Sequence, residues 1–163
     1  DWINGAFLMV KKNIVDKSGL LDEDFFLYSE ESEWCSRIKK YGKLCIFGEL
    51  NVLHLQGESA NTAFETADKG YSNLFDRKGL QIMLSSFVRI RKQFGVAWFL
   101  FDLLIYIISI PVFFIGTLFS YLQNFKMPKY RIHQFVGFCK NVLFVVKTAP
   151  TIIKNKPHFY KVI

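Results

Sequence analysis

Three carboxylates lie within four positions of the sequence, at Glu30, Glu31 and Glu33. They follow an aromatic run that ends at Tyr28, and they stand at the start of a helical pattern. Carboxylates this close repel one another, which raises the pKa of at least one of them, and a carboxylate with a raised pKa suits general-base catalysis near neutral pH. The pattern therefore predicts an ionisable base at the edge of a pocket.

The same acids also have a structural interpretation. Acidic side chains favour the N-terminus of a helix, because they complement its dipole. Glu33 and Arg37 are four residues apart, in the more favourable order for an ion pair along a helix. From spacing alone, both the catalytic and the structural interpretation stay open.

Hydrophobic patterns predict an α/β arrangement around these acids. We expect Cys35 and Cys45 to be reduced core residues, since three cysteines without a paired spacing favour no disulfide. A strand directly at the start of the chain needs neighbours in a sheet, so we expect the chain to be the C-terminal piece of a longer protein. The predicted strands are Ala6–Val10, Lys43–Phe47 and Asn51–Leu55, and the predicted helices are Lys12–Ser18 (closed by Gly19), Glu30–Tyr41 (ended by Gly42) and Tyr71–Phe94.

Charge divides the chain into two parts. Residues 1–76 contain 8 Lys/Arg and 13 Asp/Glu, a net charge of −5, whereas residues 77–163 contain 13 Lys/Arg and one acid, a net charge of +12. Such asymmetry is typical of proteins that face a membrane surface or nucleic acid. The long apolar runs within the basic part favour the membrane and argue against nucleic acid. We therefore expect a catalytic part at 1–76, a connecting helix at 77–95 and a membrane-associated helical tail at 96–163.

Two segments of this tail differ in kind. Val96–Leu122 is 27 residues long with one charge, Asp102, and as a helix it would measure about 40 Å against roughly 30 Å of hydrocarbon. Pro111 predicts a kink or break, and a single span and a re-entrant insertion both stay open. Phe135–Ile153 carries Lys140 and Lys147 on one face, which predicts a helix lying in the membrane interface until Pro150 ends it.

An ordered set of residues over positions 1–60 resembles the family 2 glycosyltransferases, and most closely their rhamnosyltransferase-like branch, which builds bacterial surface polysaccharides. The set is Asp1-Trp2-x-x-Gly5-Ala6, then Gly19-x-x-Asp22-Glu23-x-Phe25-Phe26-x-Tyr28-x-Glu30-Glu31-x-Glu33-Trp34-Cys35-x-Arg37, then Gly42, then Val52-x-His54-x-x-Gly57-x-Ser59. The resemblance implies the C-terminal half of a nucleotide-sugar-binding α/β domain.

The resemblance also implies an inverting transfer of a sugar from a nucleotide-sugar donor to a glycan acceptor, which we expect to be lipid-linked, at the cytoplasmic face of the cell membrane. Glu31 would be the catalytic base, with Glu30 as its neighbour, although the family usually has Asp where Glu31 stands. A divalent metal, Mg²⁺ or Mn²⁺, would be held mainly by the other half of the domain, with His54 completing its site. The implied substrate-binding residues are Trp2, Gly5, Ala6, Tyr28, Glu33 and Arg37. A non-catalytic, membrane-anchored interaction module is the alternative.

Overall fold

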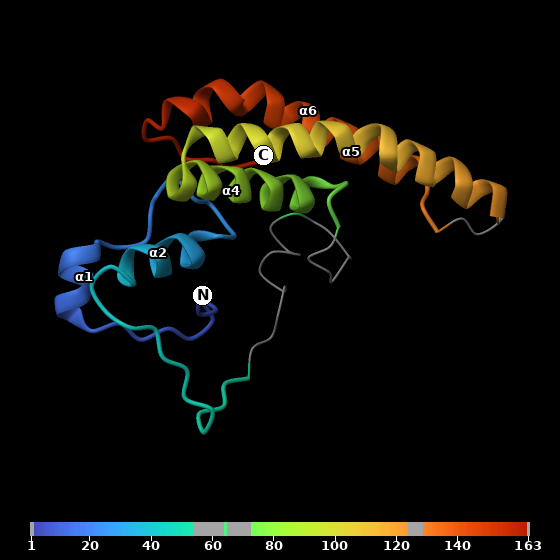
Figure 1. The fold of residues 1–163 in the computed structure, drawn as a ribbon. Coiled ribbons are helices and arrows are strands. Elements are labelled where there is room, and N and C mark those ends of the chain that lie inside the picture. Colours follow the sequence, from blue (N-terminus) through green and yellow to red (C-terminus); the bar gives the residue numbers. More distant parts are fainter. Residues whose placement is uncertain (1, 54–63, 65–72, 124–128, 163) are drawn as a thin grey trace.

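The computed structural model describes residues 2–53, 64, 73–123 and 129–162. Within these residues the chain forms helices and no strand, and its only β-type pairing is an isolated parallel bridge between Phe25 and Tyr160. The expected α/β class is therefore wrong for the described chain, which is helical. The helices are α1 (Lys12–Ser18), α2 (Glu30–Ile38), α4 (Arg77–Phe94), α5 (Val96–Gln123) and α6 (Ile132–Lys154) (Figure 1).

The three predicted strands are not formed in the described residues. A strand is stable only when its N–H and C=O groups pair with a neighbour, and no such ladder joins residues 6–10 to residues 43–47 or 51–53. Their apolar side chains are left in solvent: Met9 is 83% exposed, Ile46 82% and Leu53 89%. Cys45 is likewise exposed, contrary to expectation, whereas Cys35 is fully buried as predicted.

The predicted helices are largely confirmed. α1 has the predicted bounds, and Gly19 closes it with a φ of 74° while its N–H donates to the Val15 carbonyl. α2 ends at Ile38, three residues before the predicted end. α4 begins at Arg77 because the side chain of Asp76 caps it, accepting a hydrogen bond from the Gly79 N–H at 2.8 Å.

Helix α4 is the central element, because it contacts α2 on one side and both α5 and α6 on the other. In Figure 1, α4, α5 and α6 lie nearly parallel in a stack, with α1 and α2 beyond α4. The apolar side chains of Leu84 and Phe87 join the core shared with α5 and α6. Gln81 and Ser85 are equally buried but polar, and they bind the backbone of the N-terminal part and of the C-terminal segment.

Helices α5 and α6 form an antiparallel hairpin with a regular inner seam. The seam residues alternate spacings of four and three, the pattern that keeps one stripe of a helix against its neighbour. Phe113 of α5 packs edge-on against Phe138 of α6, with ring centroids 5.5 Å apart. The seam residues are Phe99, Leu103, Tyr106, Ile110, Phe113, Thr117 and Ser120 in α5, and Phe138, Val142, Val145, Ala149 and Ile152 in α6.

Pro150 does not end α6, contrary to expectation, and at Pro111 α5 is not broken. α5 continues through Pro111 to Gln123, and α6 continues through Pro150 to Lys154. A proline removes one backbone hydrogen bond from the helix interior. The continuous seam on both sides of each proline compensates for that loss, because packing rather than local propensity supplies most helix stability in a folded protein.

Two glycines allow the turn before α4 to lie between two helices. A Cβ on Gly79 would lie 2.3 Å from the Asn73 carbonyl oxygen, and a Cβ on Gly137 would lie 2.2 Å from that of Phe75. Both distances are far below van der Waals contact, and both opposing atoms belong to the backbone. Residues 73–76 are therefore held against α4 and α6 only because these two positions have no side chain.

Replacement of Gly137 by alanine is expected to lower the free energy of unfolding by about 1–3 kcal/mol, the usual cost of overpacking. Gly116→Ala is the matched control, because a Cβ at that position of α5 meets nothing within 4 Å and alanine favours the helix. Denaturant titration of both variants in detergent micelles measures the difference. Equal stability of the two variants would contradict the close packing of Gly137 on Phe75.

Candidate functional site

The acidic cluster begins at a strained turn before α2. Tyr28 and Ser29 have φ values of 70° and 68°, in the left-handed region that residues other than glycine seldom adopt. Ser29 is the N-cap residue, but its side chain makes no capping hydrogen bond. Strain of this kind persists only where surrounding contacts fix the backbone, and it concentrates at functional sites. The turn places Glu30 and Glu31 side by side at the first positions of α2.

Glu31 lies against the N-terminal segment. A Cβ built on Gly5 would lie 3.4 Å from the Cβ of Glu31 and 3.8 Å from its carboxyl carbon. One helical turn later, the buried Cys35 thiol contacts the Ile3 carbonyl at 4.0 Å. The structure thus brings together two of the sequence-predicted residues, Gly5 and Glu31, which are 26 positions apart in the chain.

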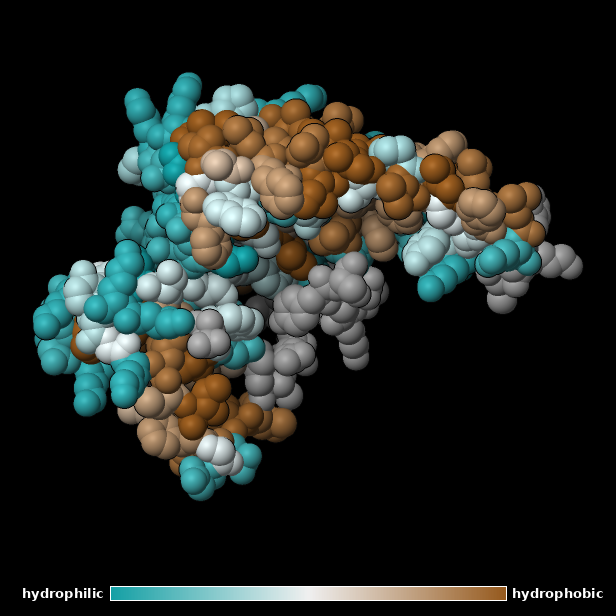
Figure 2. All heavy atoms as spheres, viewed as in Figure 1, coloured by the Kyte–Doolittle hydropathy of each residue, from teal (hydrophilic) through white to brown (hydrophobic). Residues whose placement is uncertain are grey.

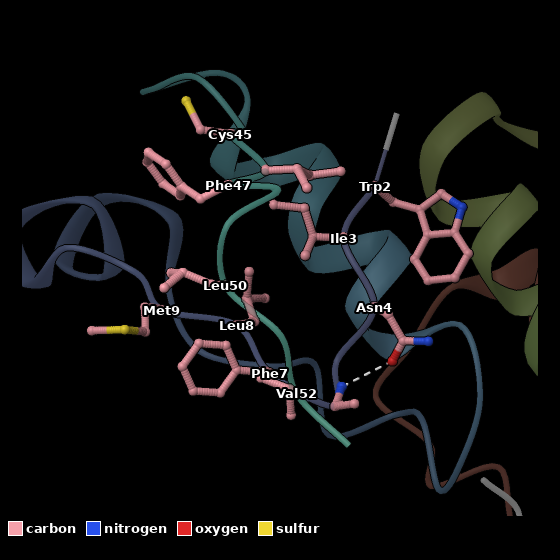
Figure 3. Close-up of a pocket in the computed structure, with 12 residues that line it drawn as sticks. Trp2, Ile3, Asn4, Phe7, Leu8, Met9, Cys45, Phe47, Leu50 and Val52 are labelled. Carbon is pink, nitrogen blue, oxygen red and sulfur yellow. Dashed lines mark hydrogen bonds between the residues drawn. The ribbon is translucent and has the colours of Figure 1, made fainter. Parts of the chain in front are cut away.

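An apolar groove of about 540 Å³ lies along the same N-terminal segment. Trp2 and Ala6, two of the residues that the family resemblance implied for substrate binding, line it, and Trp2 is 52% exposed. In Figure 3, Trp2 lies at one side of the groove, and the Ala6 N–H donates to the Asn4 side-chain oxygen at 2.9 Å. The other lining residues come from two segments: Ile3, Asn4, Phe7, Leu8 and Met9, and Cys45, Ile46, Phe47, Leu50 and Val52.

Glu30 is the carboxylate whose environment disfavours its charge. Its Oε2 atom is buried and accepts no hydrogen bond from the described residues. Burial raises the pKa of Glu30 above its ordinary value of 4.5, and repulsion from Glu31 raises this pKa further. The repulsion predicted between neighbouring acids is therefore present, but loss of solvent is the larger cause.

We expect Glu30→Gln to raise the melting temperature at neutral pH. Because the pKa of Glu30 is higher in the folded chain than in the unfolded chain, its ionisation destabilises the fold as pH rises above 4.5. The gain should shrink as pH falls towards that value, where the wild-type carboxyl takes up its proton. Thermal melts at both pH values measure the effect, with the exposed Glu23→Gln as control. A variant less stable than wild type at neutral pH would contradict it.

Glu33 and Arg37 bind each other rather than facing the groove. The guanidinium Nε lies 2.8 Å from one oxygen of Glu33, and Nη2 lies 2.7 Å from the other. Arg37 also donates to the carbonyls of Ser18 and Leu20, which ties the end of α1 to α2. Glu33, one of the three clustered acids, therefore forms the ion pair with Arg37 that their spacing predicted.

Lys92 of α4 fixes the acidic loop before the site. Its ammonium lies 2.5 Å from a carboxylate oxygen of Asp22 and 2.6 Å from one of Asp24. Burial opposes the ionisation of Asp22, but the hydrogen bonds from Lys92 and from the Asp24 N–H, together with the charges of Lys92 and Arg37, outweigh it and lower the pKa of Asp22. Asp22 and Asp24 stand two positions apart in the sequence, and the carboxylates of both bind the same Lys92 ammonium.

The C-terminal segment completes the support of the loop. The His158 N–H donates to the Asp24 side chain at 2.8 Å, and the Tyr160 N–H donates to the Asp24 carbonyl at 2.9 Å. The buried amide of Gln81 donates to the Tyr160 carbonyl and accepts from the Val162 N–H, both at 2.9 Å. Ser85 donates to the Leu27 carbonyl at 2.7 Å, one residue before the strained turn.

The sequence analysis missed these supporting residues. Asp24, Gln81, Ser85 and Lys92 hold the site without belonging to its motif. The available signal was the spacing of Gln81, Ser85 and Lys92 by four and seven residues, which places them on one face of α4. Gln93 adds a further contact, because its amide donates to the Ser32 carbonyl of α2 at 3.1 Å.

The predicted metal site falls outside the structural description. His54 is not among the described residues, and within those residues no three His, Cys, Asp or Glu side chains are grouped to hold a metal ion. The carboxylates of Asp22 and Asp24 are bound to Lys92. The described residues therefore do not by themselves fit a divalent cation, which stays a prediction.

In comparisons with known proteins, no family model, no curated protein and no solved structure matches this chain. The structure supports the predicted membrane association in one respect, the length and composition of two helices. Of the helices in the described residues, α5 and α6 are long and apolar enough to cross a membrane.

Proposed function

We propose that this chain forms the acceptor side of a membrane-associated, inverting glycosyltransferase. The observation that supports this most is the position of Glu31 beside Gly5, whose chain neighbours Asn4 and Ala6 line the groove. An ionisable base beside an open groove is the arrangement that deprotonation of an acceptor requires.

In the proposed reaction, Glu31 accepts the proton of an acceptor hydroxyl as that oxygen attacks the anomeric carbon of a nucleotide-activated sugar. The new glycosidic C–O bond forms as the bond to the nucleotide diphosphate breaks, with inversion at carbon. Glu30 is the neighbour of this base in the first turn of α2. The strained turn at Tyr28 and Ser29 and the contacts of Lys92 and Ser85 hold both carboxylates in position.

The two apolar helices supply the membrane part of the proposal. In a soluble protein, a helix as apolar as α5 is expected to be mostly buried, yet only 11% of its apolar window is buried here. A bilayer would cover this surface. Attachment to the cytoplasmic leaflet would place the acidic site near lipid-linked glycan acceptors, with the nucleotide sugar coming from the cytosol.

A donor screen tests the proposed function. The full-length gene product, in membranes or detergent, is incubated with UDP- and dTDP-activated hexoses and with lipid-linked acceptors extracted from membranes. Transfer of a sugar with inverted anomeric configuration is expected for one donor. Absence of transfer with every donor, together with recovery of a protein bound through the acidic cluster, would instead support a membrane-anchored interaction module.

A further inference from the structure

The outer face of α5 is apolar along its whole length. Phe101, Ile108 and Ile115 succeed one another every seven residues, so they lie on one face, and they are 55%, 53% and 52% exposed. Figure 2 shows brown, hydrophobic residues over much of α5 and α6, with paler residues between them. The only charged residue of α5, Asp102, interacts electrostatically with Arg89 of α4. A surface this long and uncharged requires an apolar partner.

The outer face of α6 carries a lysine stripe. Lys140, Lys147 and Lys154 are seven residues apart, so they share one face, and all three are exposed. The seam residues Phe138 and Val145 point the other way, into the core. The lysines are therefore distributed along the helix rather than confined to its ends. A helix crossing the bilayer would place Lys140 and Lys147 at hydrocarbon depth, where ammonium groups are costly.

The position of α4 decides how the hairpin lies in a bilayer. Near the middle of α6, the Asn141 amide donates to the carbonyls of Leu74 and Asp76 at 2.8 and 3.0 Å. At the other end of α4, Arg91 donates to the carbonyl of Ile153, near the end of α6. α4 therefore runs beside the C-terminal half of α6. If the hairpin crossed a membrane, the carboxylate of Asp76 and the rest of α4 would lie within the hydrocarbon.

We infer that the α5–α6 hairpin lies flat in one leaflet of an anionic bilayer, with its long axis parallel to the membrane surface. The outer face of α5 contacts hydrocarbon, the lysine stripe of α6 lies at the level of the lipid phosphates, and α4 stays on the aqueous side. This inference rests on the membrane association proposed above, and it adds the orientation. The occupant of the apolar face is a phospholipid surface, because only its headgroup boundary combines apolar contact with phosphate groups for the lysine stripe.

Charge at both ends of the hairpin agrees with this orientation. Lys129 and Arg131 lie at its tip, and Lys154 and Lys156 lie at its base. A flat hairpin places both groups at the same anionic surface, where each lysine or arginine adds attraction to the leaflet. A crossing hairpin would separate them by the full thickness of the bilayer.

Fluorescence quenching at defined depths tests the orientation. Phe101→Trp, Ile108→Trp and Ile115→Trp are made singly in a Trp98→Phe background, and the spectrum of that background is subtracted. The 163-residue chain is reconstituted into vesicles of phosphatidylcholine and phosphatidylglycerol whose acyl chains carry bromine at a shallow or a deep carbon. Phe47→Trp, in the groove on the aqueous side, is the control and should not be quenched.

A flat hairpin predicts one common depth for the three tryptophans. In a crossing or re-entrant helix, residues seven positions apart differ in depth by about 10 Å. Quenching of Ile108→Trp at the bilayer centre, with the other two much shallower, would overturn the flat orientation while leaving membrane association intact. Absence of quenching at all three positions would overturn membrane association as well.

The lysine stripe is tested separately with a membrane-impermeant, amine-reactive ester. Lys140 and Lys147 should react more slowly in the anionic vesicles than in detergent micelles, whereas the exposed Lys12 and Lys17 of α1 should react equally in both. Equal rates for the two stripe lysines in vesicles and micelles would contradict their contact with the lipid headgroups. Mass spectrometry of the acetylated peptides gives each rate.

Discussion

Glu31→Gln in the full-length enzyme is expected to lower turnover by about 100-fold or more, the scale typical of a lost general base. Glutamine preserves the shape of the side chain against Gly5 but cannot take the proton from an acceptor hydroxyl. Donor binding should therefore survive, and the loss should appear in kcat. Initial rates across donor and acceptor concentrations separate the two effects.

The exposed Glu23→Gln is the matched control, because it removes one carboxylate from the same acidic stretch without touching the groove. Its turnover should stay at the wild-type level. Near-wild-type turnover of Glu31→Gln would overturn the assignment of the base and direct attention to Glu30. The two acids are distinguishable, because only Glu30→Gln is expected to raise thermal stability at neutral pH.

Ile108→Arg combined with Ile115→Arg should release the chain from membranes. Both side chains lie on the outer face of α5, and each arginine placed in hydrocarbon costs roughly 2.5–3.5 kcal/mol. The wild-type chain should resist extraction with alkaline carbonate, whereas the double variant should move to the soluble fraction. Sedimentation after carbonate treatment measures the two fractions.

Two exposed apolar residues away from the hairpin provide the control. Met9→Arg with Leu20→Arg adds the same charge at positions that are 83% and 73% exposed in the N-terminal part, so the variant should stay with the membrane. If the Ile108 and Ile115 double variant also stayed in the membrane pellet, the outer face of α5 would not be the lipid contact. That surface would then have to be an interface between proteins.

The helices were predictable because each depends on a pattern within its own sequence. The hydrophobic pattern of α2 and the glycine after α1 indicated the positions of these helices from nearby residues alone. The strands were not predictable in this way, since a strand depends on a partner segment. The apolar runs at 6–10 and 43–47 look like strands, but in the described chain they lie unpaired along the groove.

The acidic motif of the candidate site was predictable from the sequence. The residues that hold this motif in place were not. The acidic residues and the N-terminal segment were selected by their resemblance to a family, and the structure brings Glu31 and Gly5 together. The contacts that hold them come from distant positions, such as the Asp24 carboxylate accepting from the His158 N–H across 134 residues. No local pattern marks such a pair. Pro150 was misjudged for a related reason, because the packing that retains α6 comes from its neighbour.

The pairing of Asp24 with the segment around Tyr160 has a consequence for the timing of folding. During synthesis, α1 and α2 leave the ribosome long before the residues that fix the acidic loop have been made. Contacts this distant in sequence form slowly, because closing the intervening chain costs entropy. Both helices of the α5–α6 hairpin precede residues 158–160 in the chain and are therefore made first. The acidic loop can reach its final geometry only after residues 158–160 have also been made.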